Sequence, residues 1–236
     1  MADHEEHRKP SVTKTIELDI PDVPAPTNPF LGYWGAQLVI GHFSESSKII
    51  TLSSTFVRCV FSAREDYLAA TKHLCTAFQS TREMHLSELY RSIARFESCI
   101  SSMYLAERAF VRLRRCDELS AESAAVINQE KPAFIAPAVT GKLKAARDTM
   151  EHIEELLAKG KLTEDLPYMV QPTGDEHPRT DPAQLADTVV VIDRLRIGEH
   201  VVRFAELVEW LGEMIVYVEK LRSLMPTRYT STRGPH

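Results

Sequence analysis

The sequence predicts a mainly α-helical fold: a helical bundle that carries a small β-hairpin and a C-terminal helix. Long stretches of the chain lack glycine and proline, and their apolar residues recur at steps of three or four, which is the period of an amphipathic helix. Runs of β-branched residues are concentrated near residues 187–204. With 236 residues, 44% of them hydrophobic, the chain can bury one sizeable core and needs only one domain with appendages.

The first two helices are expected at about residues 44–78 and 81–115. A polar link at residues 79–81 joins them, so they should form an antiparallel hairpin. The second has the clearest helical period in the chain, through Leu86, Leu89, Ile93, Phe96, Ile100, Met103, Ala106, Phe110 and Leu113.

Two further helices follow. One is expected from Pro137 or Val139 to Ala158, where Gly160 supplies the residue that often ends a helix in the left-handed conformation. The other spans about residues 205–224. Between them, residues 188–192 and 200–204 flank Gly198 in the pattern of a β-hairpin.

The remaining segments are less regular. Residues 13–20 alternate well enough for a short edge strand, residues 30–43 fit strand or helix, and residues 166–182 are expected to form a loop. The chain therefore divides into a proline-rich N-terminal arm and entry segment (1–43), the bundle (44–160), a loop, hairpin and helix packed on the bundle (161–225), and a flexible tail (226–236).

The predicted core combines apolar positions from the four long helices. Truncation of its members should cost stability, because deletion of buried side chains leaves cavities. Its residues are Phe56, Val60, Leu89, Ile93, Phe96, Ile100, Met103, Phe110, Met150, Ile153, Leu157, Trp210, Leu211 and Met214.

Composition excludes several classes of protein. The four cysteines are dispersed without a CxxC pair, so they are expected to be buried thiols, and no structural zinc, other metal or cofactor is predicted. There is no glycine-rich phosphate loop, nucleophile elbow or HExxH sequence. No apolar stretch reaches membrane-spanning length and no secretory leader is evident, so a cytoplasmic location is expected.

The formal net charge of −5 argues against general binding of polyanions, because such binding depends on lysine and arginine. Any contact with RNA must therefore be local. The alternative is an ordinary solvated helix face. The candidate basic surface consists of Arg108, Arg112, Arg114, Arg115, Lys142, Lys144 and Arg147.

One constellation in the third long helix has the residue types for acid–base chemistry. Because positions four apart share a helix face, Asp148 should lie beneath His152, where a carboxylate can fix the imidazole tautomer. Arg147 and Glu151 form the matching pair one step around the helix. The spacing permits a site at the border of the apolar stripe.

The segment Arg147-Asp148-x-x-x-His152 resembles the ribonuclease motif of HEPN domains, in which an arginine, a polar residue and a histidine follow a hairpin of long helices. The resemblance covers residues 44–160 and outside the motif is architectural. It implies a metal-independent endoribonuclease in which His152 acts as general acid or base, Arg147 stabilises the phosphate and Asp148 supports the histidine. Lys142, Lys144 and Arg115 are then candidate substrate-binding residues.

The resemblance also implies a homodimer whose two motifs share one cleft, RNA as the substrate, and a role as a toxin or in antiviral defence, with a cognate antitoxin or regulatory protein as a possible partner. The alternative is a non-catalytic helical protein for dimerisation or partner docking, with a degenerate motif. In that case Arg147 and Glu151 form an ordinary surface ion pair. Arg194 and His200 also satisfy the spacing of the motif, which has four to six residues between arginine and histidine, but they lie in the predicted hairpin.

Overall fold

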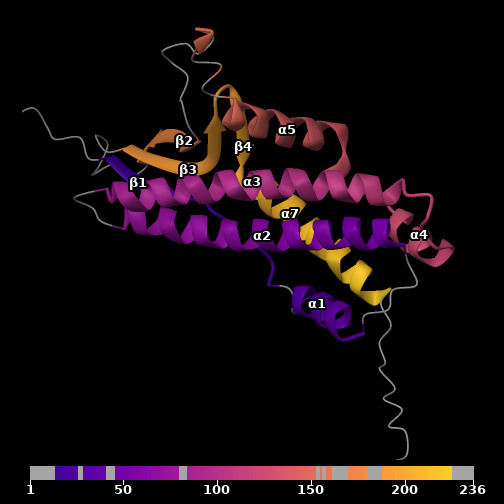
Figure 1. Ribbon diagram of the computed structural model, residues 1–236. Helices are drawn as coiled ribbons and strands as arrows, with labels where there is room; N and C mark the ends of the chain where they lie inside the picture. Colours follow the sequence, from indigo (N-terminus) through magenta and orange to yellow (C-terminus); the bar gives the residue numbers. More distant parts are fainter. Residues whose placement is uncertain are drawn as a thin grey trace, which may run out of the picture.

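The computed structural model describes residues 14–25, 29–40, 46–79, 84–152, 155, 158–160, 170–179 and 188–224. Within these residues the protein is mainly helical, with a small mixed sheet at one end (Figure 1). The expected helical fold with a β-hairpin and a C-terminal helix is therefore confirmed.

Helices α2 (Ser47–Phe78) and α3 (Leu86–Arg114) form the predicted antiparallel hairpin, which is the long axis of the molecule (Figure 1). Ser46 caps α2, because its side chain accepts a hydrogen bond from the backbone N–H of Ile49. Between the helices, the buried hydroxyl of Ser92 donates to the carbonyl of Ala70 at 2.9 Å. The hairpin is thus held by polar contacts as well as by its apolar seam.

Two further helices pack on this hairpin, and two short elements connect α3 to the first of them. Helix α5 (Pro137–Glu151) lies along α3, and helix α7 (Phe204–Ser223) crosses behind the hairpin and contacts α2 (Figure 1). Helix α4 (Ala121–Asn128) and the 3₁₀ turn η1 (Ala133–Ile135) connect α3 to α5.

Helix α5 ends earlier than the predicted Ala158. Its last residue is Glu151, and His152 leaves the helical region at φ −110° and ψ 17° while its backbone N–H still donates to the carbonyl of Asp148. Gly160 has the expected left-handed backbone, with φ 61°. The predicted core residues Ile153 and Leu157 lie outside the described residues.

The N-terminal segment contributes two elements to the body of the protein. β1 (Lys14–Leu18) confirms the expected strand, and the segment that fitted strand or helix forms helix α1 (Pro29–Ile40), which contacts α7. Between them, the hydroxyl of Tyr67 donates to the carbonyl of Pro21 at 2.8 Å. This bond fixes the segment to α2.

The sheet is built around β3 (Thr188–Ile197), which pairs in parallel with β1 and antiparallel with β2 (Gln171–Pro178) and β4 (His200–Arg203). The β3–β4 hairpin around Gly198 is confirmed; the glycine has φ 58°.

Strand β2 contradicts the prediction of a loop at residues 166–182. Its sequence, QPTGDEHP, has no apolar alternation. Pairing depends instead on Gly174, where a Cβ atom would lie 1.6 Å from the carbonyl oxygen of Val191 and where the register shifts.

Most of the predicted core is buried. Among the predicted core residues that the structure describes, Leu89 and Met150 are partly buried and the others are buried. An aromatic cluster that includes unpredicted members fills the centre: Phe110 lies 5.0 Å from Phe56, 5.1 Å from Phe134 and 4.7 Å from Tyr217, measured between ring centroids.

The cysteines follow the prediction with one exception. Cys59, Cys99 and Cys116 are buried free thiols, whereas Cys75 is exposed on α2. Among the described helices, none combines the length and the apolar character needed to cross a membrane.

Candidate functional site

Arg147 projects from α5 onto α3. Its guanidinium group lies over the ring of Tyr104, 5.2 Å from the centroid, and is ion-paired with Glu151. Asp148 Oδ1 is 3.7 Å from its Nη1 atom. The side chain of Arg147 is 27% exposed.

Asp148 contacts a different residue from the one expected. Its main partner is Lys144, one turn earlier on α5, and this hydrogen bond is the largest cause that lowers the pKa of Asp148. Burial opposes the shift, and the charges of Lys144, Arg147 and His152 add to it. Asp148 is thus an ionised carboxylate at neutral pH.

His152 lies at the C-terminal end of α5, with its side chain 55% exposed. Its Nδ1 atom is 3.5 Å from Oε1 of Glu155, which also pairs with Lys159. The carboxylate beside the imidazole is therefore Glu155. Because the helix ends at Glu151, the side chain of His152 does not continue the i,i+4 row on which its pairing with Asp148 was predicted.

The expected substrate-binding residues have separate environments. Lys142 donates to both carboxylate oxygens of Glu206, at 2.8 and 2.9 Å, and so ties α5 to α7. Lys144 is bound to Asp148. Arg115 follows α3 and is exposed, with no carboxylate partner among the described residues. The structure therefore leaves only Arg115 of the three without an ion pair.

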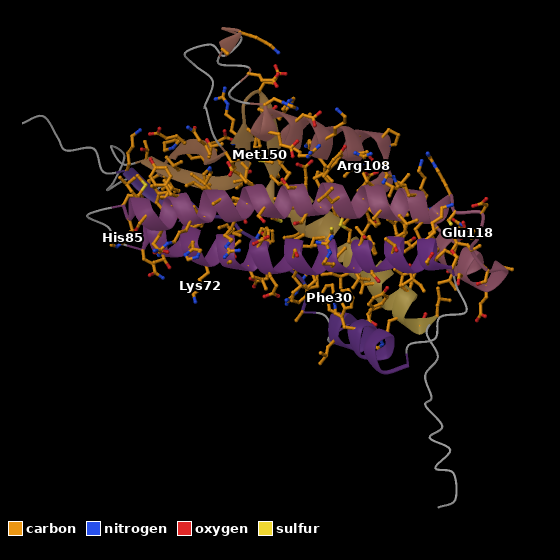
Figure 2. The ribbon with its side chains drawn as sticks, viewed as in Figure 1. Phe30, Lys72, His85, Arg108, Glu118 and Met150 are labelled. Atoms are coloured by element: carbon orange, nitrogen blue, oxygen red, sulfur yellow. The ribbon has the colours of Figure 1, made fainter. Side chains whose placement is uncertain are left out.

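Tyr104 connects the motif to a larger basic surface. Arg108 lies one turn further along α3, and its guanidinium group is 5.6 Å from the centroid of the Tyr104 ring. Its Nη1 atom donates a hydrogen bond to the tyrosine hydroxyl at 3.3 Å. Arg108 and Arg147 thus share one aromatic ring, in the region between α3 and α5 where Figure 2 labels Arg108. The sequence indicated these arginines but not Tyr104 as their common partner.

A buried carboxyl lies beneath the same surface. Glu107 is 3% exposed, and its nearest polar partner is the hydroxyl of Thr140 at 3.4 Å. Desolvation raises the pKa of Glu107, while the hydrogen bond from Thr140 and the charges of Arg108 and Arg115 oppose this shift. Its carboxylate partly offsets the positive charge above it.

Two recesses adjoin Arg115 at the end of α3. One, of about 490 Å³, is lined by the start of α2 and by Arg112 and Arg115. The other, of about 420 Å³, is lined by Arg114, Arg115 and Lys131 together with apolar residues. Arg115 is common to both.

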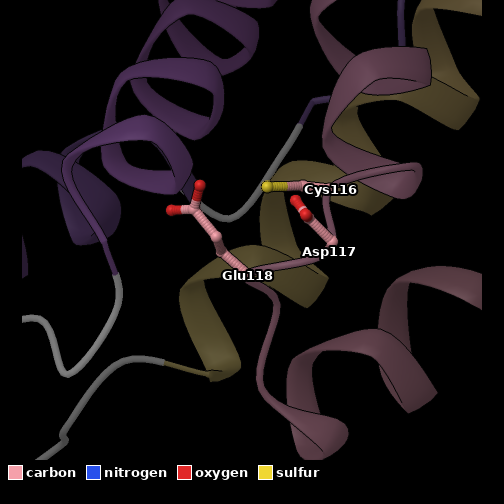
Figure 3. Close-up of side chains that lie close together, drawn as sticks. All are labelled: Cys116, Asp117 and Glu118. Atoms are coloured by element: carbon pink, nitrogen blue, oxygen red, sulfur yellow. The ribbon is translucent and has the colours of Figure 1, made fainter.

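Cys116, Asp117 and Glu118 have ligand atoms within 4.8 Å of one another (Figure 3). The ammonium group of Lys48 lies 3.4 Å from Asp117 and 3.3 Å from Glu118. A backbone hydrogen bond lowers the pKa of Asp117 and a hydrogen bond from Ser46 lowers the pKa of Glu118, and in both cases Lys48 adds to the shift. Lys48 is thus a cationic partner of both carboxylates.

His73 of α2 contacts a carboxylate of the other long helix. Its Nδ1 atom is 2.6 Å from Oε2 of Glu88, and Glu88 also pairs with Arg91. The contact joins α2 to α3 near the other end of the hairpin. Residues on separate helices give no local spacing signal, so the sequence offered no means of finding it.

The fold and the site together define a mainly helical protein with a small mixed sheet and an arginine-rich face. Comparisons with protein-family models, curated proteins and solved structures give no match for this chain. The candidate function therefore depends on the residues of the site itself.

Proposed function

We propose that the protein is a metal-independent endoribonuclease in which Arg147 and His152 act on the phosphodiester bond. The observation that supports this most directly is the shared position of Arg147 and Arg108 on the ring of Tyr104. It places the motif arginine next to the arginine-rich face of α3, where a phosphate backbone would meet positive charge. The HEPN resemblance supplies the roles.

The chemistry is a transesterification. A neutral His152 accepts the proton of the ribose 2′-hydroxyl, the 2′-oxygen attacks phosphorus, and the bond to the 5′-oxygen breaks as that oxygen receives a proton. The products are a 2′,3′-cyclic phosphate and a free 5′-hydroxyl. Arg147 would stabilise the extra negative charge on the phosphoryl oxygens.

One histidine cannot serve as base and acid in the same step. In the proposed homodimer, the His152 of a second copy supplies the acid, which fits the position of this exposed side chain at the end of α5. Sedimentation at tens of micromolar should therefore give a dimer. A strict monomer at that concentration would remove the composite cleft.

The RNA must displace existing partners. Glu151 holds Arg147, and Glu155 lies beside His152. Both are exposed surface pairs, each worth about 0–1 kcal/mol, so a phosphate group can replace a carboxylate at modest cost. In the resembled family such activity serves toxins and defence, which would make a cognate antitoxin or regulatory protein a natural partner.

The same ion pairs favour a second candidate: a non-catalytic helical protein for dimerisation or partner docking. In this case Arg147 and Glu151 form an ordinary helix-surface pair, and Arg147 contributes to the packing of α5 on Tyr104. The two candidates differ in what RNA incubation will produce.

The test is incubation of the pure protein with total RNA in EDTA. Cleavage should persist, leave 2′,3′-cyclic phosphate ends, and decrease by about 10² or more in Arg147→Ala and His152→Ala, whereas Asp148→Asn should have a smaller effect. His200→Ala is the matched control, because His200 follows Arg194 within the same range of spacing, with four to six residues between arginine and histidine, but lies in β4. Activity that survives in His152→Ala, or requires divalent metal, would favour the non-catalytic candidate.

A further inference from the structure

The outer face of α3 carries a line of mostly polar and basic side chains, with one leucine among them. Their spacing of three or four residues keeps them on one side of the helix. In order they are Arg91, Arg95, Ser98, Ser102, Leu105, Arg108, Arg112 and Arg115, which immediately follows the helix.

The two ends of this line differ in how their charge is balanced. At the first end, Arg91 pairs with Glu88 at 2.5 Å and Arg95 pairs with Asp66 at 2.8 Å. At the second end, Arg108, Arg112 and Arg115 are exposed, and none forms an ion pair with a carboxylate of the described chain. The helical rise of about 1.5 Å per residue places these three within roughly 10 Å along the axis.

This second end is unfavourable in the free protein. Three like charges at such separations repel one another, and the buried Glu107 beneath them offsets this repulsion only in part. An anionic ligand would relieve the repulsion. Guanidinium groups are suited to phosphate, because their planar fork can donate two hydrogen bonds to one group.

The surface is also shaped for a chain rather than for a single ion. Arg108 and Arg147 lie against Tyr104 at one end, and Arg115 lines both recesses at the other, with Lys131 in the lining of the second. Several adjacent anionic groups can thus be contacted at once. A polymer of phosphates fits this arrangement better than one small anion.

The ring beneath these arginines is not available to bases. Tyr104 is only 5% exposed, and the apolar member of the line, Leu105, is aliphatic. Stacking on aromatic side chains is what commonly holds unpaired bases, so contacts here would be to phosphate and would not depend on sequence.

We propose that Arg108, Arg112 and Arg115 bind the phosphodiester backbone of single-stranded RNA independently of its sequence and lead it to Arg147. This inference deepens the proposed function by assigning its substrate-binding surface, but binding itself requires no cleavage. It replaces the expected contribution of Lys142 and Lys144, whose ammonium groups are held by Glu206 and Asp148.

The test measures binding of a labelled 12-nucleotide RNA of mixed sequence by fluorescence anisotropy, in EDTA, with His152→Ala present in every variant to prevent cleavage. Arg112→Gln and Arg115→Gln should each reduce the slope of log affinity against log salt by about 0.7 to 1, and the double variant should lose about tenfold in affinity. A second RNA of different sequence should bind equally well.

Arg91→Gln is the matched control, because it removes the same charge from the same helix at a position already paired with Glu88. It should leave the salt slope nearly unchanged. An equal loss in Arg91→Gln, or no loss in the double variant with unchanged thermal unfolding, would overturn the proposal. Binding of a polyglutamate peptide with the same arginine dependence, without binding of RNA, would overturn it in favour of an acidic protein partner.

These outcomes separate the two proposals. RNA binding that depends on Arg112 and Arg115, in a wild-type protein that cleaves nothing, would support the binding surface and contradict the ribonuclease. If cleavage at limiting RNA depends on His152 but is unchanged by the Arg112→Gln and Arg115→Gln double variant, the ribonuclease is supported and the binding surface is contradicted.

Discussion

At the scale of single residues, Arg147 shows how far spacing alone can define a site. The i,i+4 rule correctly predicted its ion pair with Glu151, because both residues lie within α5. The same rule placed Asp148 against His152, but Asp148 pairs with Lys144, and the imidazole is next to Glu155. The difference arises at the helix end, which apolar periodicity located too late.

Removal of Glu151 should expose the role of this ion pair. Glu151→Gln frees the Arg147 guanidinium and removes a charge that repels phosphate, so RNA should bind about two- to fivefold more tightly, corresponding to a surface pair of up to about 1 kcal/mol. Anisotropy in the His152→Ala background measures it. Glu219→Gln removes an equal charge from the Glu219–Arg222 pair of α7. If both variants tighten binding equally, net charge rather than Arg147 is responsible.

At the scale of elements, the long helices were predictable because each repeats its apolar pattern over several turns, as α3 does from Ile93 to Leu113. Strand β2 was not, because its pairing depends on a close backbone approach at Gly174 and not on apolar side chains. Helix α1 was ambiguous for a related reason: its short apolar sequence fits either period, and its contact with α7 decides the outcome.

Gly174→Ala should disrupt β2. A Cβ atom cannot lie 1.6 Å from the carbonyl oxygen of Val191, so the strands must separate, at a cost of about 1–3 kcal/mol in the free energy of unfolding. Urea denaturation measures the cost. Gly141→Ala is the control: no atom lies within 4 Å of its Cβ position in α5, and it should stabilise the protein by about 0.5–1 kcal/mol. Equal stability of both variants would mean that β2 is not paired in solution.

Phe96→Ala tests the packing of α3. The side chain is fully buried between Tyr67 and Phe204, with ring centroids 6.1 and 5.2 Å away, so its removal should cost about 3–5 kcal/mol. Leu105→Ala, on the outer face and 49% exposed, should change stability by about 0.5 kcal/mol or less. A small loss in Phe96→Ala would show that the wrong face of α3 has been placed inward.

At the scale of the whole molecule, charge is distributed unevenly. Despite the acidic total, α3 ends in a cluster of arginines that have no carboxylate partner among the described residues. The sequence indicated these arginines, but whether they form ion pairs depends on neighbouring helices. The fold class was predictable from the sequence, whereas the shared ring of Tyr104 and the recesses beside Arg115 depend on how α5, α4 and η1 pack against α3.

Acid should destabilise the protein. Among the described residues, six carboxyl groups have lowered pKa values, each first because of a hydrogen bond that favours its ionised form: Glu88, Asp117, Glu118, Asp148, Asp175 and Glu176. Their contribution is fully present above the unfolded pKa of about 4 and is lost as pH falls through the lower folded values, because the unfolded state then binds more protons.

Glu97 and Glu107 act in the opposite direction, since burial raises their pKa values and their effect on stability becomes less favourable as pH rises above about 4.5. The six groups outnumber these two, so the urea midpoint should fall between pH 5 and pH 3. Added salt should reduce this dependence, because most of the six are exposed. A midpoint that rises on acidification would contradict the assignment.

The parallel pairing of β1 with β3 sets an order of events during synthesis. Lys14 is synthesised long before its partner Thr188, which lies 174 residues later in the chain. At ordinary elongation rates of about 5–20 residues per second, β1 waits roughly 9 to 35 s for that partner. The α2–α3 hairpin, made entirely from neighbouring segments, can form in this interval, so the sheet closes onto a helical hairpin that already exists. Strand β1 therefore joins the fold late, and it should remain unpaired and accessible to proteases in the nascent chain until β3 has been made.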